Sequence, residues 1–249
     1  MDGLINFNKS TGITSAKALY RVRAITRQRK SGHAGTLDPA ASGVLVLCLG
    51  KATKLVERIM DQPKVYRATA RLEVTSESFD SDRPLQPVAV ENPPERTAVE
   101  SACQAFEGII QQAPPAISAI KIGGVPAYKR NTRDSALTLS PRPVTIYWLH
   151  VHAYEWPNLD FEVCCGRGTY VRAIIRDLGE KLRTGACLTS LVRQAVGPFT
   201  VEDAWSLERL SSASPAQYLI PLEAAAALLA DEGKCVPPKP STAIASAAD

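Results

Sequence analysis

Asp38 is the residue whose type and surroundings most directly suggest chemistry. It precedes Pro39, and a residue before proline is kept in an extended conformation, so Asp38 cannot simply continue a helix. Glycines at positions 32, 35 and 43 permit backbone turns on either side of it. We therefore expect a carboxylate displayed on a loop, where it could act as a nucleophile or stabilise charge. The alternative is an ordinary turn, because Asp-Pro is common in turns that have no further function.

Hydrophobic patterns predict the elements that must position this loop. Residues 4–8 predict a short strand, and Thr14 or Ser15 can cap a helix whose apolar residues recur at helical spacing. Residues 28–43 predict a loop, since they contain three glycines and a proline. The apolar run 44–49 is bounded by glycines and predicts a strand buried on both faces, which would hold the carboxylate in place.

The remaining chain alternates between strand and helix signals. Strands are expected at 66–74, 144–154 and 159–165, and helices at 51–60, 97–106, 170–182 and after Leu222. Residues 111–143 contain five prolines and several basic side chains, and so long an irregular segment inside a domain is usually functional or disordered.

Composition narrows the class of protein. Among the 249 residues, no apolar run approaches the roughly 20 residues that span a bilayer, and the N-terminus lacks a secretory pattern, so a cytoplasmic protein is expected. None of the six cysteines forms a Cys-x-x-Cys pair, which argues against zinc and against a disulfide framework. His150 and His152 would share one face of a strand, but a catalytic metal usually needs a third protein ligand, so no metal is expected.

Positive charge is concentrated in the first part of the chain. Up to residue 75 there are 13 Lys and Arg residues and only 5 acidic ones, although the net charge of the whole chain is only +4. Such a segment suits a polyanionic partner, because neutralised phosphates release counterions. A solvated basic helix face explains the same pattern equally well.

Several motifs follow one another in order along the chain. They are KSTGITS at 9–15, GHAGTLDPAASGVL at 32–45, GKATK at 50–54, KVYR at 64–67, PPAISAIKIGGVPAY at 114–128, GTYVRAIIRDLG at 168–179 and LVRQAVGPF at 191–199. Together they resemble the signature of the TruB family of pseudouridine synthases, over residues 3 to about 225. In the first motif, Ser10 stands where the family usually has proline.

The resemblance implies a fold and a reaction. The fold would be one α+β domain over residues 1–225, with a central mixed, mostly antiparallel β-sheet flanked by helices and a thumb loop projecting at about 111–143. Residues 226–249 would form a short helix and a disordered tail, with no room for the PUA domain that family members often carry. The reaction would be isomerisation of uridine to pseudouridine without a cofactor, in which the uracil leaves its ribose, turns and is rejoined through carbon.

The resemblance also assigns roles around the base. Asp38 would be the catalytic carboxylate, attacking the sugar or the base or stabilising charge as the glycosidic bond breaks. Arg172 would pair with Asp38 and orient it. Tyr66 would stack on the flipped base and Tyr170 would line its pocket, whereas by pattern alone both are ordinary core aromatics. Leu191 would contact the uracil edge.

Further residues would contact the rest of the RNA. By resemblance, His33 inserts where the target base leaves the RNA stack. Candidates for contacts with the RNA backbone are Lys9, Lys54, Lys121, Lys129 and Arg130.

The expected substrate is the T-loop uridine at position 55 of tRNA, modified by a monomer that needs no protein partner. One alternative is a dyskerin-type synthase, which shares the GTLDP core but depends on guide RNA and partner proteins. Another is an RNA-binding protein or tRNA-folding chaperone without catalysis. Turnover on bare tRNA distinguishes the expected enzyme from a guide-RNA-dependent synthase. Loss of that turnover in Asp38→Asn distinguishes catalysis from RNA binding or chaperoning alone.

The basic segment leads to a prediction about salt. If the positive residues form an RNA-binding groove, affinity for tRNA will fall steeply between about 50 and 200 mM salt, because phosphate contacts release counterions. Filter binding across this range measures the slope. A flat response would contradict the basic groove.

Overall fold

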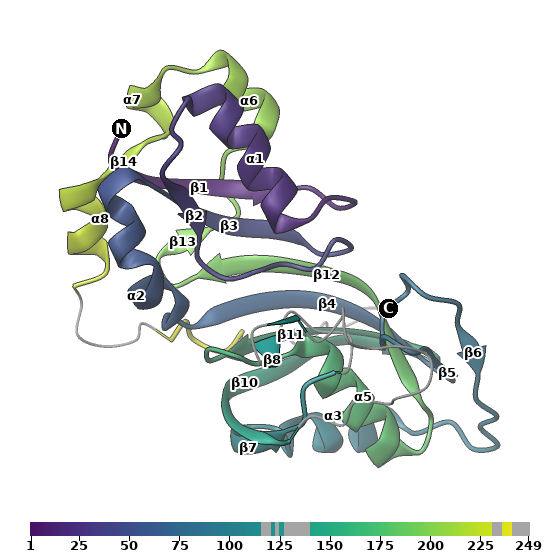
Figure 1. Ribbon diagram of the computed structural model, residues 1–249. Coiled ribbons are helices and arrows are strands. Elements are labelled where there is room, and N and C mark those ends of the chain that lie inside the picture. Colours follow the sequence, from purple (N-terminus) through teal and green to yellow (C-terminus); the bar gives the residue numbers. More distant parts are fainter. Residues whose placement is uncertain (116–120, 123–124, 127–139, 231–235, 241–249) are drawn as a thin grey trace, which may run out of the picture.

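One ten-stranded sheet runs through the molecule in the computed structural model (Figure 1). The structure describes residues 1–115, 121–122, 125–126, 140–230 and 236–240. The strand order is β14-β1-β3-β12-β4-β11-β10-β7, with β2 added beside β3 and β13 beside β12. The bounds are β1 Gly3–Lys9, β2 Ser31–His33, β3 Ser42–Leu49, β4 Lys64–Leu72, β7 Gly108–Gln112, β10 Arg142–Glu155, β11 Asn158–Cys165, β12 Ala186–Val196, β13 Phe199–Thr200 and β14 Ile220–Pro221. The predicted α+β fold with a mostly antiparallel sheet is confirmed.

The two halves of the sheet meet at a parallel pairing of β3 with β12. Val192 lies opposite Ser42 and Arg193 opposite Gly43. Gly43 has a φ of +99°, and a Cβ atom there would lie 2.2 Å from the Arg193 carbonyl oxygen. Glycine is therefore required both by the backbone conformation and by the close approach of the neighbouring strand.

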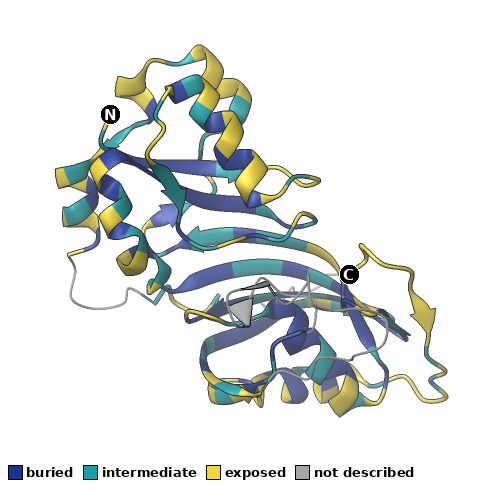
Figure 2. Ribbon diagram, in the orientation of Figure 1, coloured by how far each residue is buried: buried dark blue, intermediate teal, exposed yellow. Residues whose placement is uncertain are grey.

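Both faces of the N-terminal half are covered by helices, as Figures 1 and 2 show. On one face, Val44, Val46 and Cys48 of β3 belong to a core with η1 (Gly50–Leu55), α2 (Val56–Met60) and α8 (Leu222–Leu228). On the other, Leu45, Leu47 and Leu49 belong to a core with α1 (Ser15–Thr26), α6 (Leu207–Ser212) and α7 (Pro215–Tyr218). The prediction of a strand buried on both faces is confirmed.

The other half has its main core on one face. Helices α3 (Arg96–Gln104) and α5 (Val171–Leu182) share a core with the inward residues of β4, β10 and β11. Tyr66 and Leu191 pack against both this core and the α1 core, so they lie where the two halves meet. On the opposite face, residues 236–240 pass over the sheet, and Trp148 Nε1 donates a hydrogen bond of 2.7 Å to the Pro237 carbonyl. This part of the predicted disordered tail is therefore packed; residues 241–249 lie outside the described residues.

Most predicted elements are present, with differences at their ends. Thr14 caps α1 by accepting a hydrogen bond of 3.1 Å from the Lys17 amide. The helix expected at 51–60 begins as a 3₁₀ turn, and the loop at 28–43 contains the short strand β2. The predicted thumb is shorter than 111–143, because its ends belong to the paired strands β7 and β10; two-residue strands β8 (Lys121–Ile122) and β9 (Val125–Pro126) lie inside it.

The elements that the pattern did not predict include β7 and the central strand β12. Register shifts interrupt β12 between Leu188 and Ser190 and again between Arg193 and Ala195, which removes the regular alternation that identifies a strand. A further two-stranded ribbon joins β5 (Val74–Thr75) to β6 (Gln86–Pro87). Within the described residues, no helix is both long and apolar enough to cross a membrane.

The close approach at Gly43 leads to a stability prediction. Gly43→Ala should lower the free energy of unfolding by about 1–3 kcal/mol or more, because alanine would be strained at this φ and would collide with β12. Urea unfolding followed by circular dichroism measures the loss. Gly32→Ala in the same loop is the matched control, since nothing lies within 4 Å of its added Cβ. Equal stabilities of the two variants would contradict the account of the junction.

Candidate active site

A cavity of about 370 Å³ opens where the two halves of the sheet meet. Its walls come from the loop before β3, from β4 and β12, and from the turn that leads into α5. Five of the predicted site residues line this cavity, although they come from distant parts of the sequence. They are Asp38, Tyr66, Tyr170, Arg172 and Leu191.

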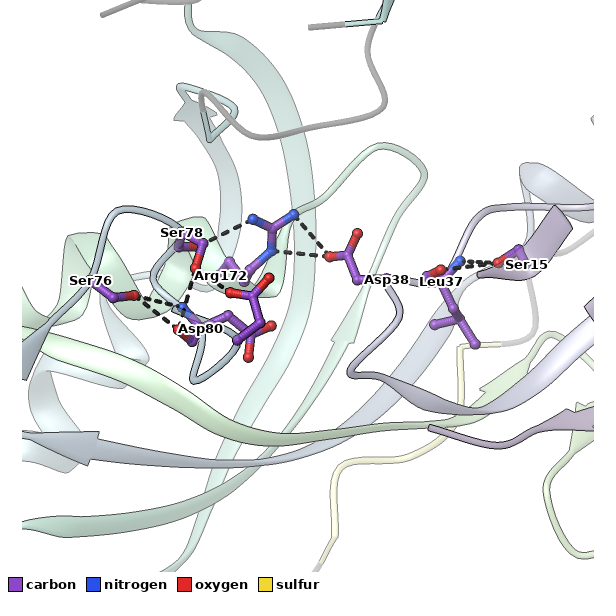
Figure 3. A network of polar contacts seen from close by, with 8 residues as sticks. Ser15, Leu37, Asp38, Ser76, Ser78, Asp80 and Arg172 are labelled. Atoms are coloured by element: carbon purple, nitrogen blue, oxygen red, sulfur yellow. Dashed lines mark hydrogen bonds and ion pairs between the residues drawn. The ribbon is translucent and has the colours of Figure 1, made fainter. Parts of the chain in front are cut away.

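Asp38 is positioned by the backbone of its own loop (Figure 3). The buried Ser15 hydroxyl accepts a hydrogen bond of 2.9 Å from the Leu37 amide and donates one of 3.0 Å to the Leu37 carbonyl. The Gly12 amide donates to the Pro39 carbonyl at 2.8 Å. The residues on both sides of Asp38 are therefore tied to the start of α1, which limits the positions its carboxylate can take.

Arg172 binds the Asp38 carboxylate from the buried side. Asp38 Oδ2 accepts from Arg172 Nε at 3.0 Å and lies 2.9 Å from its Nη2. The arginine side chain is only 6% exposed and the aspartate 41%, so the carboxylate faces the cavity while its partner is buried behind it. Arg172 Nη1 donates to the Ser78 carbonyl at 3.2 Å, and Asp80 lies close enough for the Arg172 charge to act on it. Burial, and then Asp82, raise the pKa of Asp80, an effect that Arg172 opposes.

Tyr170 is held at the N-terminus of α5 by a buried glutamine. The Tyr170 amide donates to Gln112 Oε1 at 2.8 Å, and Gln112 Nε2 donates to the Tyr170 carbonyl at 3.2 Å. Arg142 lies 5.6 Å from the centre of the tyrosine ring and donates to the Gly168 carbonyl at 2.9 Å. The edge strand β7 therefore fixes a wall of the cavity through Gln112.

Tyr66 projects from β4 beside two buried cations that sequence reasoning missed. Burial raises the pKa of its hydroxyl, and the Arg193 guanidinium beside it acts in the opposite direction. Lys64, on the same strand, donates to the carbonyls of Met60 and Gln62, and burial lowers its pKa to about 8. Arg193 and Lys64 belong to the motifs LVRQAVGPF and KVYR, which also contain the predicted site residues Leu191 and Tyr66. A sequence pattern does not reveal that a basic side chain points inward.

The predicted RNA contacts lie elsewhere, and one of them is wrong. Lys9 is fully buried, and its Nζ donates to the carbonyls of Ser10 (2.9 Å), Ile13 (2.8 Å) and Pro39 (3.4 Å), so it supports the Asp38 loop and is not available to a phosphate. Lys54 is exposed at the end of η1.

His33 lies on β2, half-buried and outside the cavity wall. Burial lowers the pKa of its imidazole. The side chain of Lys121, and Lys129 and Arg130 altogether, lie outside the described residues.

His150 and His152 do share a face of β10. Their rings pack edge to face with centres 4.6 Å apart, and His152 Nε2 lies 3.0 Å from Glu162 Oε2. In the part of the chain that the structure describes, no group of three or more His, Cys, Asp or Glu side chains could hold a metal ion.

Comparison with known proteins places this cavity in a family. The model of the TruB family pseudouridylate synthase N-terminal domain matches residues 23–171, and that of the tRNA pseudouridylate synthase B C-terminal domain matches residues 172–226. The chain belongs to the TruB family. The resemblance seen in the motifs is thereby confirmed, and both matched regions contribute residues to the wall of the same cavity.

Curated relatives carry the name tRNA pseudouridine synthase B. The protein from Syntrophotalea carbinolica is 42% identical over 217 residues, covering 86% of this chain and 70% of the relative. The protein from Clostridium perfringens is 37% identical over 226 residues, covering 90% of this chain and 77% of the relative.

Solved structures similar to this TruB-family chain include two complexes. One is a Cbf5-Nop10-Gar1 complex, with a TM-score of 0.70 and 27% identity over 91% of this chain and 62% of the other. The second is an H/ACA RNP bound to a substrate RNA containing 2′-deoxyuridine, with a TM-score of 0.66 and 25% identity over 91% of this chain and 61% of the other. The chain thus spans less than two thirds of each of these two structures.

The bonds around Leu37 lead to a prediction about activity. Ser15→Ala leaves a buried amide and a buried carbonyl without a partner, which should cost about 1–3 kcal/mol of stability. Because Asp38 is the next residue, turnover should also fall while RNA affinity changes little. Urea unfolding and single-turnover kinetics measure the two effects. Ser10→Ala, at an exposed position nearby, is the control, and identical behaviour of both variants would show that Ser15 does not position the loop.

Proposed function

We propose that this chain isomerises uridine to pseudouridine in tRNA, at position 55 of the T-loop, without a cofactor. The observation that carries the proposal is the Asp38–Arg172 pair, with the carboxylate facing a cavity whose other walls include two tyrosines and a leucine. The names of the relatives support tRNA as the substrate. In this proposal the enzyme works in the cytoplasm as a monomer, contacts the T-arm and needs no protein partner.

The cavity suits a base that has left the RNA stack. Its volume of about 370 Å³ accommodates a pyrimidine ring with part of its ribose. In the proposed roles, Tyr66 stacks on the uracil, Tyr170 lines its pocket and Leu191 contacts its edge. His33, outside the cavity, occupies the place that the base leaves in the RNA.

Asp38 acts as the nucleophile in the proposed reaction. Arg172 orients the carboxylate through charge-assisted hydrogen bonds to Oδ2. Once the uracil has turned, the carboxylate must leave again. If it holds the ribose it leaves as the new carbon–carbon bond forms, and if it holds the base it leaves afterwards. A base must also remove the proton from the carbon that forms the new bond.

A second candidate is a guide-RNA-dependent synthase, favoured by the TM-score of 0.70 with the Cbf5-Nop10-Gar1 complex. Identities of 37% and 42% with proteins named tRNA pseudouridine synthase B favour the stand-alone enzyme over the structure that is 27% identical. Bare tRNA as substrate, with no guide RNA or partner protein, separates the two. The remaining candidate, an RNA-binding chaperone, predicts no turnover by the unaltered chain.

The test is an activity measurement with purified protein, unmodified tRNA and no cofactor. The unaltered chain should form pseudouridine, and Asp38→Asn should lose at least about 1,000-fold in rate, because the amide is a very poor nucleophile. Asp203→Asn, at an exposed position away from the cavity wall, is the matched control and should keep full activity. Substantial activity in Asp38→Asn would refute its role as nucleophile, and an inactive unaltered chain would refute the proposed reaction.

A further inference from the structure

The cavity wall carries far more positive than negative charge. Its ionisable side chains are one carboxylate, Asp38, and five cations, namely Lys64, Arg142, Arg167, Arg172 and Arg193. Two of these cations have acidic partners: Arg172 pairs with Asp38, and Arg167 pairs with Glu57 and Asp61 at 2.8 and 3.0 Å. The excess charge therefore comes from Lys64, Arg142 and Arg193, none of which belongs to an ion pair formed within the described residues.

Arg193 is the most buried of these cations. Its residue is only 1% exposed, and it is among the largest fully buried side chains of the protein. Nε donates to the Val44 carbonyl at 2.7 Å and Nη2 to the Gly35 carbonyl at 3.2 Å. None of the ion pairs formed within the described residues includes it. Its charge acts instead on the Tyr66 phenol and on the amines of Lys9 and Lys64.

Two carbonyl bonds and a hydrogen bond to the Tyr66 hydroxyl do not account for a cation at this position. Burying a charge without an opposite charge is costly, and the amide of a glutamine could donate to a carbonyl without that cost. Arg193 is also close to two lysines, which adds repulsion. Since it is buried and lines the cavity, the group that benefits from its charge must be one that enters the cavity.

A neutral uracil needs no such charge, but the reaction makes the ring negative. When Asp38 bonds to C1′ of the ribose, the C1′–N1 bond breaks and its electron pair leaves with the uracil as an anion. If Asp38 instead bonds to C6 of the base, the electron pair of the C5–C6 double bond moves onto the ring and its O4. Either route places negative charge on the base within the cavity.

We propose that Arg193 is a further catalytic residue, which stabilises the negative charge on the uracil while the ring is detached and turned. The inference rests on the proposed function, because it concerns the same reaction. In the final step of the sugar route, the electron pair returns as the C5–C1′ bond and Asp38 leaves as a carboxylate. C5 then loses its proton to a base and N1 gains one, so Arg193 itself exchanges no proton.

The first test compares two substitutions of Arg193 in single-turnover reactions with tRNA. Arg193→Gln should lower the rate about 100-fold or more, as expected when a preorganised charge is removed from a developing anion. Arg193→Lys keeps the charge but holds it differently, and should lose about tenfold. Affinity for tRNA, measured by filter binding, should stay within about twofold, because a buried side chain does not contribute to phosphate binding.

The matched control is Arg176→Gln. The Arg176 side chain is only 16% exposed and its Nη2 donates to the Ala113 carbonyl at 3.0 Å, so this variant also removes a largely buried arginine that is bonded to a backbone carbonyl, but outside the cavity wall. It should keep its activity. An equal loss of rate in Arg176→Gln and Arg193→Gln would assign Arg193 a structural role and overturn the inference.

The second test changes the leaving group. Fluorine at C5 withdraws electrons and stabilises the uracil anion, so tRNA with 5-fluorouridine at the target position depends less on a protein cation. We therefore expect the rate lost by Arg193→Gln to be at least about tenfold smaller when consumption of N-linked 5-fluorouridine is followed by mass spectrometry. Equal losses with both substrates, or no loss with uridine, would overturn the inference.

If Arg193→Gln does not fold, the rates of Arg193→Lys with uridine and with 5-fluorouridine are compared instead. The rate lost by this variant should again be smaller with 5-fluorouridine. An equal loss of rate with both substrates, or no loss with uridine, would refute the role of the charge. Failure of the proposed function is a separate result, since the unaltered chain would then form no pseudouridine at all.

Discussion

The parallel pairing of β3 with β12 is the constraint on which the arrangement of the site depends. It joins two segments about 150 residues apart and sets the Asp38 loop, which enters β3, beside the strand that carries Leu191 and Arg193. The approach is so close that a Cβ atom at Gly43 would lie 2.2 Å from the Arg193 carbonyl oxygen. Because β12 also pairs with β4, the same junction places Tyr66 against the cavity.

Buried charge is the second organising feature, and it is handled differently at each position. Arg172 is neutralised by Asp38 and by its proximity to Asp80. Lys9 donates to carbonyls on two segments, and so ties the turn before α1 to the Asp38 loop. Lys64 and Arg193 also have carbonyl partners, but they line the cavity. The only carboxylate in the described wall of the cavity, Asp38, is already paired with Arg172, and the other ionisable side chains of that wall are cations. This excess of positive charge favours any reaction that places negative charge in the cavity.

The packing explains how such a cavity can exist inside a continuous sheet. Helices cover the two halves separately, and the α1 core and the α5 core meet only through partly buried residues such as Tyr66 and Leu191. These two side chains are shared by both cores and at the same time line the cavity. The cavity is thus a consequence of two cores that lie side by side on one sheet without closing over its centre.

Local sequence determined much of this protein. The cap at Thr14, the strand buried on both faces at 44–49, the alternation of β4 and the exposed turn at Asp38 all follow from the conformational preferences of neighbouring residues. The ordered motifs were sufficient to predict the family and five residues of the cavity wall. These features depend on contacts within a few residues, or on motifs that are continuous in the sequence.

Only the tertiary structure decided which basic residues face inward. Lys9 was predicted to bind RNA and is fully buried, while Lys64 and Arg193 were not selected and line the cavity. The strand β12 was not predicted because two register shifts break its alternation. The physical reason is the same in each case, because burial and strand pairing depend on segments that are far apart in the sequence. The sequence near a lysine or arginine does not show whether its side chain is solvated or donates to buried carbonyl oxygens.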